Sequence, residues 1–135
     1  MRIHHMGFFT PKLEVFVKFY TSKLEFSAGE VVSLPKKLMN ELFGLRDSCR
    51  MVKLSREDII LEVFEPENTS VMVPSGLHTG CNHWGLAVPD KAEFIQGLKK
   101  EGIPIIEFNK NGKILCFVRD PDGNSIEISD AGRKK

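Results

Sequence analysis

The order of apolar and polar positions near the start of the chain predicts a strand followed by a helix. Residues 2–10 form a short, partly apolar segment that ends at Pro11, as a strand does when a helix comes next. From Pro11 to Leu24, apolar side chains recur at helical intervals with lysine and glutamate between them. Thr10 is a suitable N-cap, and proline suits the first helical position.

Extended segments are predicted after this helix. Residues 30–34 look extended, and residues 50–54 are expected to pair with residues 59–64 across a polar turn. Residues 35–45 are compatible with either a short helix or a loop. The first half of the chain therefore predicts a strand, a helix and three strands.

A polar connection at residues 65–76, rich in helix and strand breakers, is the best candidate for an internal boundary. Beyond it the same order of elements returns at residues 83–88, 91–102, 103–108, 113–119 and 125–129. Asp90 is expected to cap the second helix, and Asn111-Gly112 is a strong signal for a hairpin turn. Both halves thus predict β-α-β-β-β.

The repetition extends to individual residues. His5 opens the first half as His83 opens the second, each followed two residues later by glycine, and the closing strands carry Glu62 and Glu127 between apolar neighbours. Each half therefore offers one histidine and one glutamate. Two copies are too few for a solenoid, so we expect the halves to pack around a shared centre.

Alternation along the strands indicates which side chains point together. His83 shares its face with Gly85 and Ala87, and Glu127 lies between two serines on its own face, while large apolar residues take the opposite faces. Small neighbours leave room for an ion and a ligand. Ile60 and Phe64 share the face of Glu62 and could wall an apolar pocket.

Each candidate also has a simpler structural interpretation. A single histidine at a strand start is more often structural, and a glutamate between isoleucines often just faces water. The equivalent positions in a duplicated unit favour a shared site instead. His4 is a rival for His5, but it has the opposite parity, and Asn82 rather than histidine precedes His83. His78 is expected in a loop.

Two imidazoles and two carboxylates suit a divalent zinc, nickel, cobalt, manganese or iron ion. A six-coordinate ion would keep two positions open for neighbouring substrate oxygens, which makes Lewis-acid catalysis possible. The three cysteines include no Cys-x-x-Cys pair, so neither a disulfide framework nor a cysteine zinc site is indicated.

Composition narrows the class of protein. The 135 residues are about one domain, and 41% hydrophobic with 27% charged residues is typical of a soluble globular protein. The net charge of +1 gives no case for a nucleic-acid partner. No apolar run approaches the roughly 20 residues of a membrane span, so we expect a cytoplasmic protein that does not bind membranes.

Two motifs resemble those of a known superfamily. Residues 3–7 (IHHMG) with residues 19–26 (FYTSKLEF), and residues 120–127 (DPDGNSIE), resemble the opening and closing motifs of vicinal oxygen chelate proteins, the glyoxalase/bleomycin resistance/dioxygenase superfamily. Glu25 replaces the usual glycine. The resemblance covers nearly the whole chain.

This resemblance implies an α+β fold in which two tandem βαβββ modules form a cupped mixed sheet around a metal, the glyoxalase-like fold. Residues 1–135 would then be a single vicinal oxygen chelate domain, with module one at about residues 1–70 and module two at about residues 78–130. It also implies a homodimer, and it places the metal ligands at His5, Glu62, His83 and Glu127.

The full ligand set resembles that of glyoxalase I, which implies a lyase or isomerase acting on a small 2-oxo or thioester substrate through a metal-bound enediolate. Glu127 or Glu62 would be the catalytic base, with a slight preference for Glu127. Phe9 stands where glutathione-using members typically carry arginine, which argues against glutathione. The alternatives are a coenzyme A-thioester epimerase, where glutamine often replaces the first glutamate, and a non-catalytic small-molecule binding protein. Extradiol dioxygenase chemistry would prefer a single carboxylate.

Overall fold

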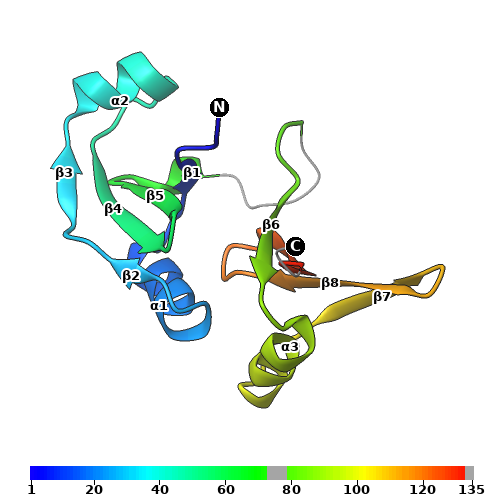
Figure 1. Ribbon diagram of the computed structural model, residues 1–135. Helices are drawn as coiled ribbons and strands as arrows, with labels where there is room; N and C mark the ends of the chain where they lie inside the picture. Colours follow the sequence, from blue (N-terminus) through cyan, green and yellow to red (C-terminus); the bar gives the residue numbers. More distant parts are fainter. Residues whose placement is uncertain (73–78, 133–135) are drawn as a thin grey trace. The chain divides into compact units, whose positions relative to one another are not determined.

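The first of two compact units, Met1–Val73, is built on a five-stranded mixed sheet (Figure 1). Its strands lie in the order β1-β5-β4-β2, with β3 also paired to β4, and only β1 and β5 run parallel. The elements are β1 (Met6–Phe9), α1 (Leu13–Lys23), β2 (Ser27–Ala28), β3 (Val32–Leu34), α2 (Lys36–Phe43), β4 (Cys49–Arg56), β5 (Ile59–Pro66) and the 3₁₀ turn η1 (Thr69–Val71). This computed structural model describes residues 1–72 and 79–132.

The two helices of this unit pack on opposite faces of the sheet. The apolar stripe of α1 is buried, and the ring of Phe16 lies 5.7 Å from that of Phe8 on β1. On the other face, Met39 of α2 packs with Cys49 and Phe64. Strand alternation therefore gives the first sheet a mostly buried face beneath α1 and a second face that α2 covers only in part.

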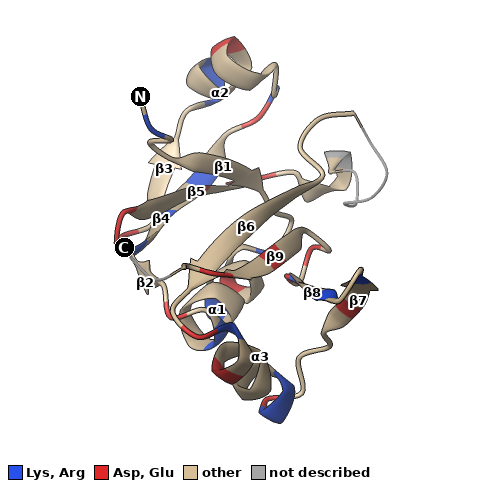
Figure 2. Ribbon diagram, turned by 45° about the vertical axis from the view of Figure 1, so that its right-hand side comes forward, with Lys and Arg blue, Asp and Glu red and all other residues tan. Residues whose placement is uncertain are grey.

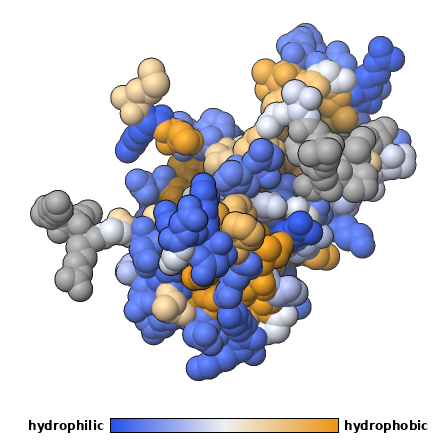
Figure 3. Space-filling view, turned by 90° about the vertical axis from the view of Figure 1, so that its right-hand side faces the viewer, coloured by the Kyte–Doolittle hydropathy of each residue, from blue (hydrophilic) through white to orange (hydrophobic). Residues whose placement is uncertain are grey.

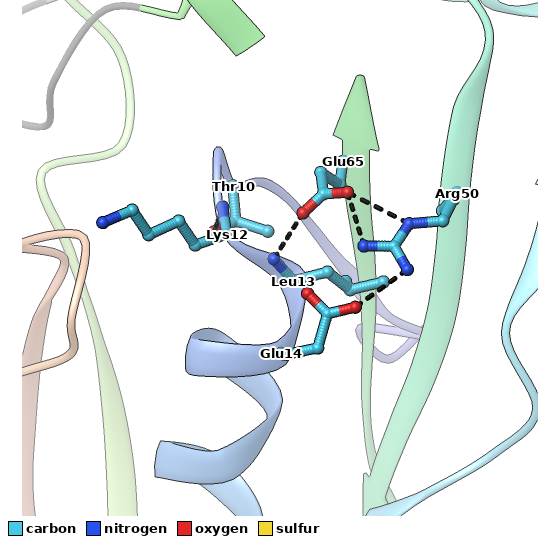
Figure 4. Close-up of polar contacts among 6 residues, drawn as sticks. All are labelled: Thr10, Lys12, Leu13, Glu14, Arg50 and Glu65. Carbon is cyan, nitrogen blue, oxygen red and sulfur yellow. Dashed lines mark hydrogen bonds and ion pairs between the residues drawn. The ribbon is translucent and has the colours of Figure 1, made fainter. Parts of the chain in front are cut away.

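The start of α1 is held by a strand that is distant in sequence (Figure 4). The backbone N–H of Leu13 donates to Oε2 of Glu65 on β5 at 2.7 Å, and the other carboxylate oxygen accepts from Arg50 at 2.6 Å. Arg50 also pairs with Glu14 at 2.8 Å, and this hydrogen bond lowers the pKa of Glu14. The predicted helix start at Pro11 is therefore wrong by two residues, and Thr10 Oγ1 accepts from the N–H of Lys12, before the helix.

The second unit, Pro74–Lys135, has a four-stranded sheet in the order β6-β9-β8-β7, again with one parallel pair, β6 and β9. Its elements are β6 (His83–Val88), α3 (Lys91–Lys100), β7 (Ile106–Lys110), β8 (Lys113–Arg119) and β9 (Ser125–Asp130). As predicted, Asp90 caps α3 by accepting from the N–H of Glu93 at 2.9 Å, and Asn111-Gly112 turns the β7–β8 hairpin with positive φ at both residues. The strand predicted from residue 103 begins only at Ile106.

Both units repeat one topology, because the order β1-β5-β4 corresponds to β6-β9-β8. The predicted α+β class with duplicated β-α-β-β-β order is confirmed, with one difference. In the first unit the segment after α1 forms two short strands, β2 and β3, which both pair with β4, and the undecided residues 35–45 contain the helix α2. Gly29 lies between these strands, and its N–H donates to the carbonyl of Lys53 at 2.9 Å.

Basic and acidic residues are both spread along the helices and strands (Figure 2). α3, for example, has Glu93 in its first turn and two lysines in its last. Apolar side chains also reach the surface, as the space-filling view shows (Figure 3), and the most exposed in the strands is Phe108 at 65%. Among residues 1–72 and 79–132, no helix is long and apolar enough to span a membrane.

Candidate metal centre

In the first unit, the parallel pairing of β1 and β5 brings His5 and Glu62 together. Gly7 lies directly beside Glu62 in the strand register, and His5 comes two residues earlier, on the same face. His5 Nε2 lies 2.8 Å from Oε1 of Glu62. The His5 side chain is 45% exposed and that of Glu62 is 19% exposed, so both can reach a ligand from solvent.

The second unit repeats this arrangement on β6 and β9. Gly85 lies beside Glu127 in the register, and His83 comes two residues before Gly85. His83 Nε2 lies 3.5 Å from Oε2 of Glu127, with side-chain exposures of 43% and 29%. The face chosen by strand alternation is as predicted, because β6 alternates between exposed His83, Gly85 and Ala87 and buried neighbours.

The distances within each pair suit two ligands of one divalent ion. With bonds of about 2.1 Å, adjacent ligands lie about 3 Å apart around an octahedral ion and about 3.4 Å apart around a tetrahedral one. The observed N–O distances of 2.8 Å and 3.5 Å lie close to these values. Over the described parts of the chain, no three histidine, cysteine, aspartate or glutamate side chains gather in a metal-binding cluster. Each unit therefore holds one histidine–glutamate pair whose spacing is compatible with binding a divalent ion.

Residues before the two histidines contact the remaining ring nitrogens. His4 Nδ1 lies 2.8 Å from His5 Nδ1, and Oδ1 of Asn82 lies within hydrogen-bonding distance of His83 Nδ1. By sequence alone, His4 is a rival of His5 for the ligand position, and Asn82 stands where a counterpart of His4 would be in the second half. The structure instead gives both residues the same position and the same contact. The signal available in the sequence was their shared place directly before each histidine.

An aromatic cluster, Phe9, Phe43 and Phe64, belongs to the first unit and lies on the sheet face of Glu62. The three ring centroids are 5.5 to 5.8 Å apart. Phe64 is buried, whereas Phe9 and Phe43 are 37% and 49% exposed. Phe64 was expected on this face, but Phe43 was missed because α2 was not predicted firmly. His78 lies outside the described residues.

The two sheets have the same topology, and each carries a histidine and a glutamate on one face. The protein is therefore a duplicated α+β protein with side chains of the kinds that bind metal ions. The chain belongs to the Glyoxalase/Bleomycin resistance protein/Dioxygenase superfamily, whose family model matches residues 2–128. The resemblance noted in the sequence is therefore confirmed.

Solved structures agree with this fold. A glyoxalase family protein from Enterococcus faecalis is similar with a TM-score of 0.72 and 23% identity, over 94% of this chain and 95% of that one. A glyoxalase family protein from Bacillus cereus gives a TM-score of 0.76 at 14% identity, over 96% and 93% of the two chains. The trypanothione-dependent glyoxalase I of Leishmania major gives a TM-score of 0.67 at 21% identity, over 96% of this chain and 86% of that one.

Proposed function

We propose that this protein is a metal-dependent lyase or isomerase of the glyoxalase I-like type, acting on a small 2-oxo or thioester compound. The observation that carries this proposal is the repeated pair. In each unit, a histidine Nε2 faces a glutamate carboxylate across two parallel strands, at equivalent positions. A nitrogen and oxygen donor pair that repeats at equivalent positions is more simply explained by a common role in metal binding than by two unrelated surface contacts.

The proposed ligands are His5, Glu62, His83 and Glu127, holding one zinc, nickel, cobalt, manganese or iron ion. None of these donors is a thiolate, and the set of imidazoles and carboxylates suits any of the five. When bound, the ion would supply Lewis-acid stabilisation of negative charge on a substrate oxygen.

Glu127 is the better candidate for the catalytic base. Its carboxylate is more exposed than that of Glu62, 29% against 19%, and it lies farther from its histidine, 3.5 Å against 2.8 Å. A carboxylate held less tightly is freer to take a proton from the carbon beside a carbonyl group and return it to the adjacent carbon. Glu62, in contrast, would act mainly as a ligand.

The aromatic cluster favours a substrate with an apolar group. Phe9 stands where a carboxylate-binding arginine would be expected in a glutathione-using relative, and a phenyl ring offers no partner to a carboxylate. An apolar substrate group that covers the exposed parts of Phe9 and Phe43 would instead remove apolar surface from water, which favours binding. We therefore propose that the substrate carries an apolar thiol or acyl group and that this group binds near Glu62.

The test is a titration of the metal-free protein with nickel, zinc, cobalt and manganese while hemithioacetal isomerisation is measured. At least one ion should bind and produce activity, and Glu127→Gln should lower kcat by roughly 10²- to 10⁴-fold while the circular dichroism spectrum stays unchanged. Glu107→Gln is the matched control, because Glu107 lies in the same sheet on the opposite face.

Each outcome separates the alternatives. Metal binding without isomerase activity, but with epimerisation of a coenzyme A thioester, would replace the proposed reaction with the epimerase. Binding of no metal at all would favour the non-catalytic binding protein. Full turnover by Glu127→Gln would refute Glu127 as the base.

A further inference from the structure

The residue before each proposed ligand histidine contacts the ring nitrogen that the glutamate does not face. In the first unit, His4 Nδ1 lies 2.8 Å from His5 Nδ1 while His5 Nε2 faces Glu62. In the second, Asn82 Oδ1 meets His83 Nδ1 while His83 Nε2 faces Glu127. Both contacts are exposed and local, and each is made independently within its own unit.

The two contacts impose a condition on the imidazoles. A neutral imidazole has one N–H and one lone pair. Asn82 Oδ1 and the Glu127 carboxylate are both acceptors, so a neutral His83 can donate to only one of them. If Nδ1–H donates to Asn82, the Nε2 lone pair points towards the carboxylate. That arrangement is favourable when a cation lies between the nitrogen and the carboxylate.

We propose that His4 and Asn82 are positioning residues that prepare His5 and His83 to bind the ion through Nε2. Each would accept the Nδ1–H of the histidine that follows it, which sets the tautomer and the ring orientation. This inference rests on the proposed metal site. It assigns roles to two residues that lie outside the ligand set.

His4 meets His5 through Nδ1, as an acceptor of the His5 Nδ1–H would. The rings of His4 and His5 meet edge to face, with centroids 5.1 Å apart and planes at 86°. The Nδ1 of His4 is directed at His5 Nδ1 and is therefore engaged. Asn82 makes the equivalent contact through its amide oxygen. Each unit therefore places an acceptor at the same position, although the residue types differ.

The experiment compares zinc affinities of the full chain by competition with a chromogenic chelator. His4→Ala and Asn82→Ala remove the acceptor, and each should weaken zinc binding by about 10- to 100-fold. His4→Asn supplies the acceptor that the other unit uses and should restore most of the affinity. Ile3→Ala is the control for disturbance of the N-terminal segment, because Ile3 is 80% exposed.

A second measurement reads the tautomer directly. In the zinc-loaded protein, ¹⁵N NMR should place the proton of His5 and His83 on Nδ1, and this N–H should exchange faster with water in the alanine variants. Wild-type zinc affinity in both alanine variants would overturn the positioning role and leave the metal site intact. Affinity as weak in His4→Asn as in His4→Ala would make His4 a ligand instead. Failure of the wild-type chain to bind zinc or another divalent ion would overturn the metal site and this inference together.

Discussion

At the scale of single residues, strand alternation explains why the candidate site could be located in advance. Glycine lies beside each glutamate in the register, Gly7 beside Glu62 and Gly85 beside Glu127, and each histidine comes two residues earlier. A period of two fixes the face of every side chain once the strand is known. The hydrogen bonds of His4 and Asn82 could not be predicted, because they depend on side-chain torsions.

Phe9 provides a prediction about substrate choice. Phe9→Arg should raise kcat/KM for the hemithioacetal of glutathione and lower it for that of an apolar thiol, because a guanidinium pairs with carboxylates while the apolar contact is lost. Loss of that contact alone should reduce kcat/KM by about 10- to 200-fold. Steady-state kinetics with both hemithioacetals measure the ratio of the two kcat/KM values. Phe9→Leu keeps an apolar side chain and should leave the preference unchanged, and an unchanged ratio in Phe9→Arg would remove Phe9 from the substrate site.

At the scale of elements, the junction between β1 and α1 shows where local reasoning ends. Thr10 and Pro11 are good helix-start residues, yet the first N–H of the helix is bound by Glu65, 52 residues away. A carboxylate near the helix N-terminus is also favoured by the helix dipole. The better acceptor comes from a neighbouring strand, and so the helix begins at Leu13. By contrast, α3 is capped by the adjacent Asp90, and that cap was predicted.

Removal of this distant cap should destabilise the fold. Glu65→Ala leaves the N–H of Leu13 without its acceptor and removes one of the two carboxylates that pair with Arg50, and should lower the free energy of unfolding by about 1–3 kcal/mol. Urea denaturation followed by circular dichroism measures this change. A loss no larger than that of a neutral surface substitution would show that water replaces the carboxylate fully.

The control is Glu14→Ala, which removes only an exposed partner of Arg50 and should have a much smaller effect. Because Arg50 lowers the pKa of Glu14, the pair stabilises the folded chain above the ordinary carboxyl pKa and loses this contribution as the pH falls through the lowered value. The difference in the free energy of unfolding between Glu14→Ala and the wild type should therefore become smaller at acid pH.

At the scale of the whole molecule, the duplicated topology predicts how metal and stability are linked. If the two His/Glu pairs share one ion, titration should end near one equivalent of zinc per chain, and zinc should raise Tm until a chelator is added. His5→Ala and His83→Ala should each abolish most of this rise, although they lie in different units. Calorimetry and thermal unfolding measure both quantities. Two equivalents per chain would mean that each pair binds its own ion.

The control for this experiment is Asp90→Ala, which removes the cap of α3 and leaves the proposed ligands untouched. It should lower Tm by a similar amount with and without zinc. A reduced zinc effect in this variant would indicate that lost stability, and not lost ligands, explains the histidine variants.

The sequence by itself determined the class of fold, the repeat and the superfamily. Helical periodicity, strand alternation and turns such as Asn111-Gly112 depend on neighbouring residues, and so β6, α3 and the β7–β8 hairpin could be predicted from them. The tertiary structure alone decided the start of α1, the division of one strand into β2 and β3, and the contribution of Phe43. These features depend on which acceptors and surfaces distant segments bring close, and no local pattern encodes that.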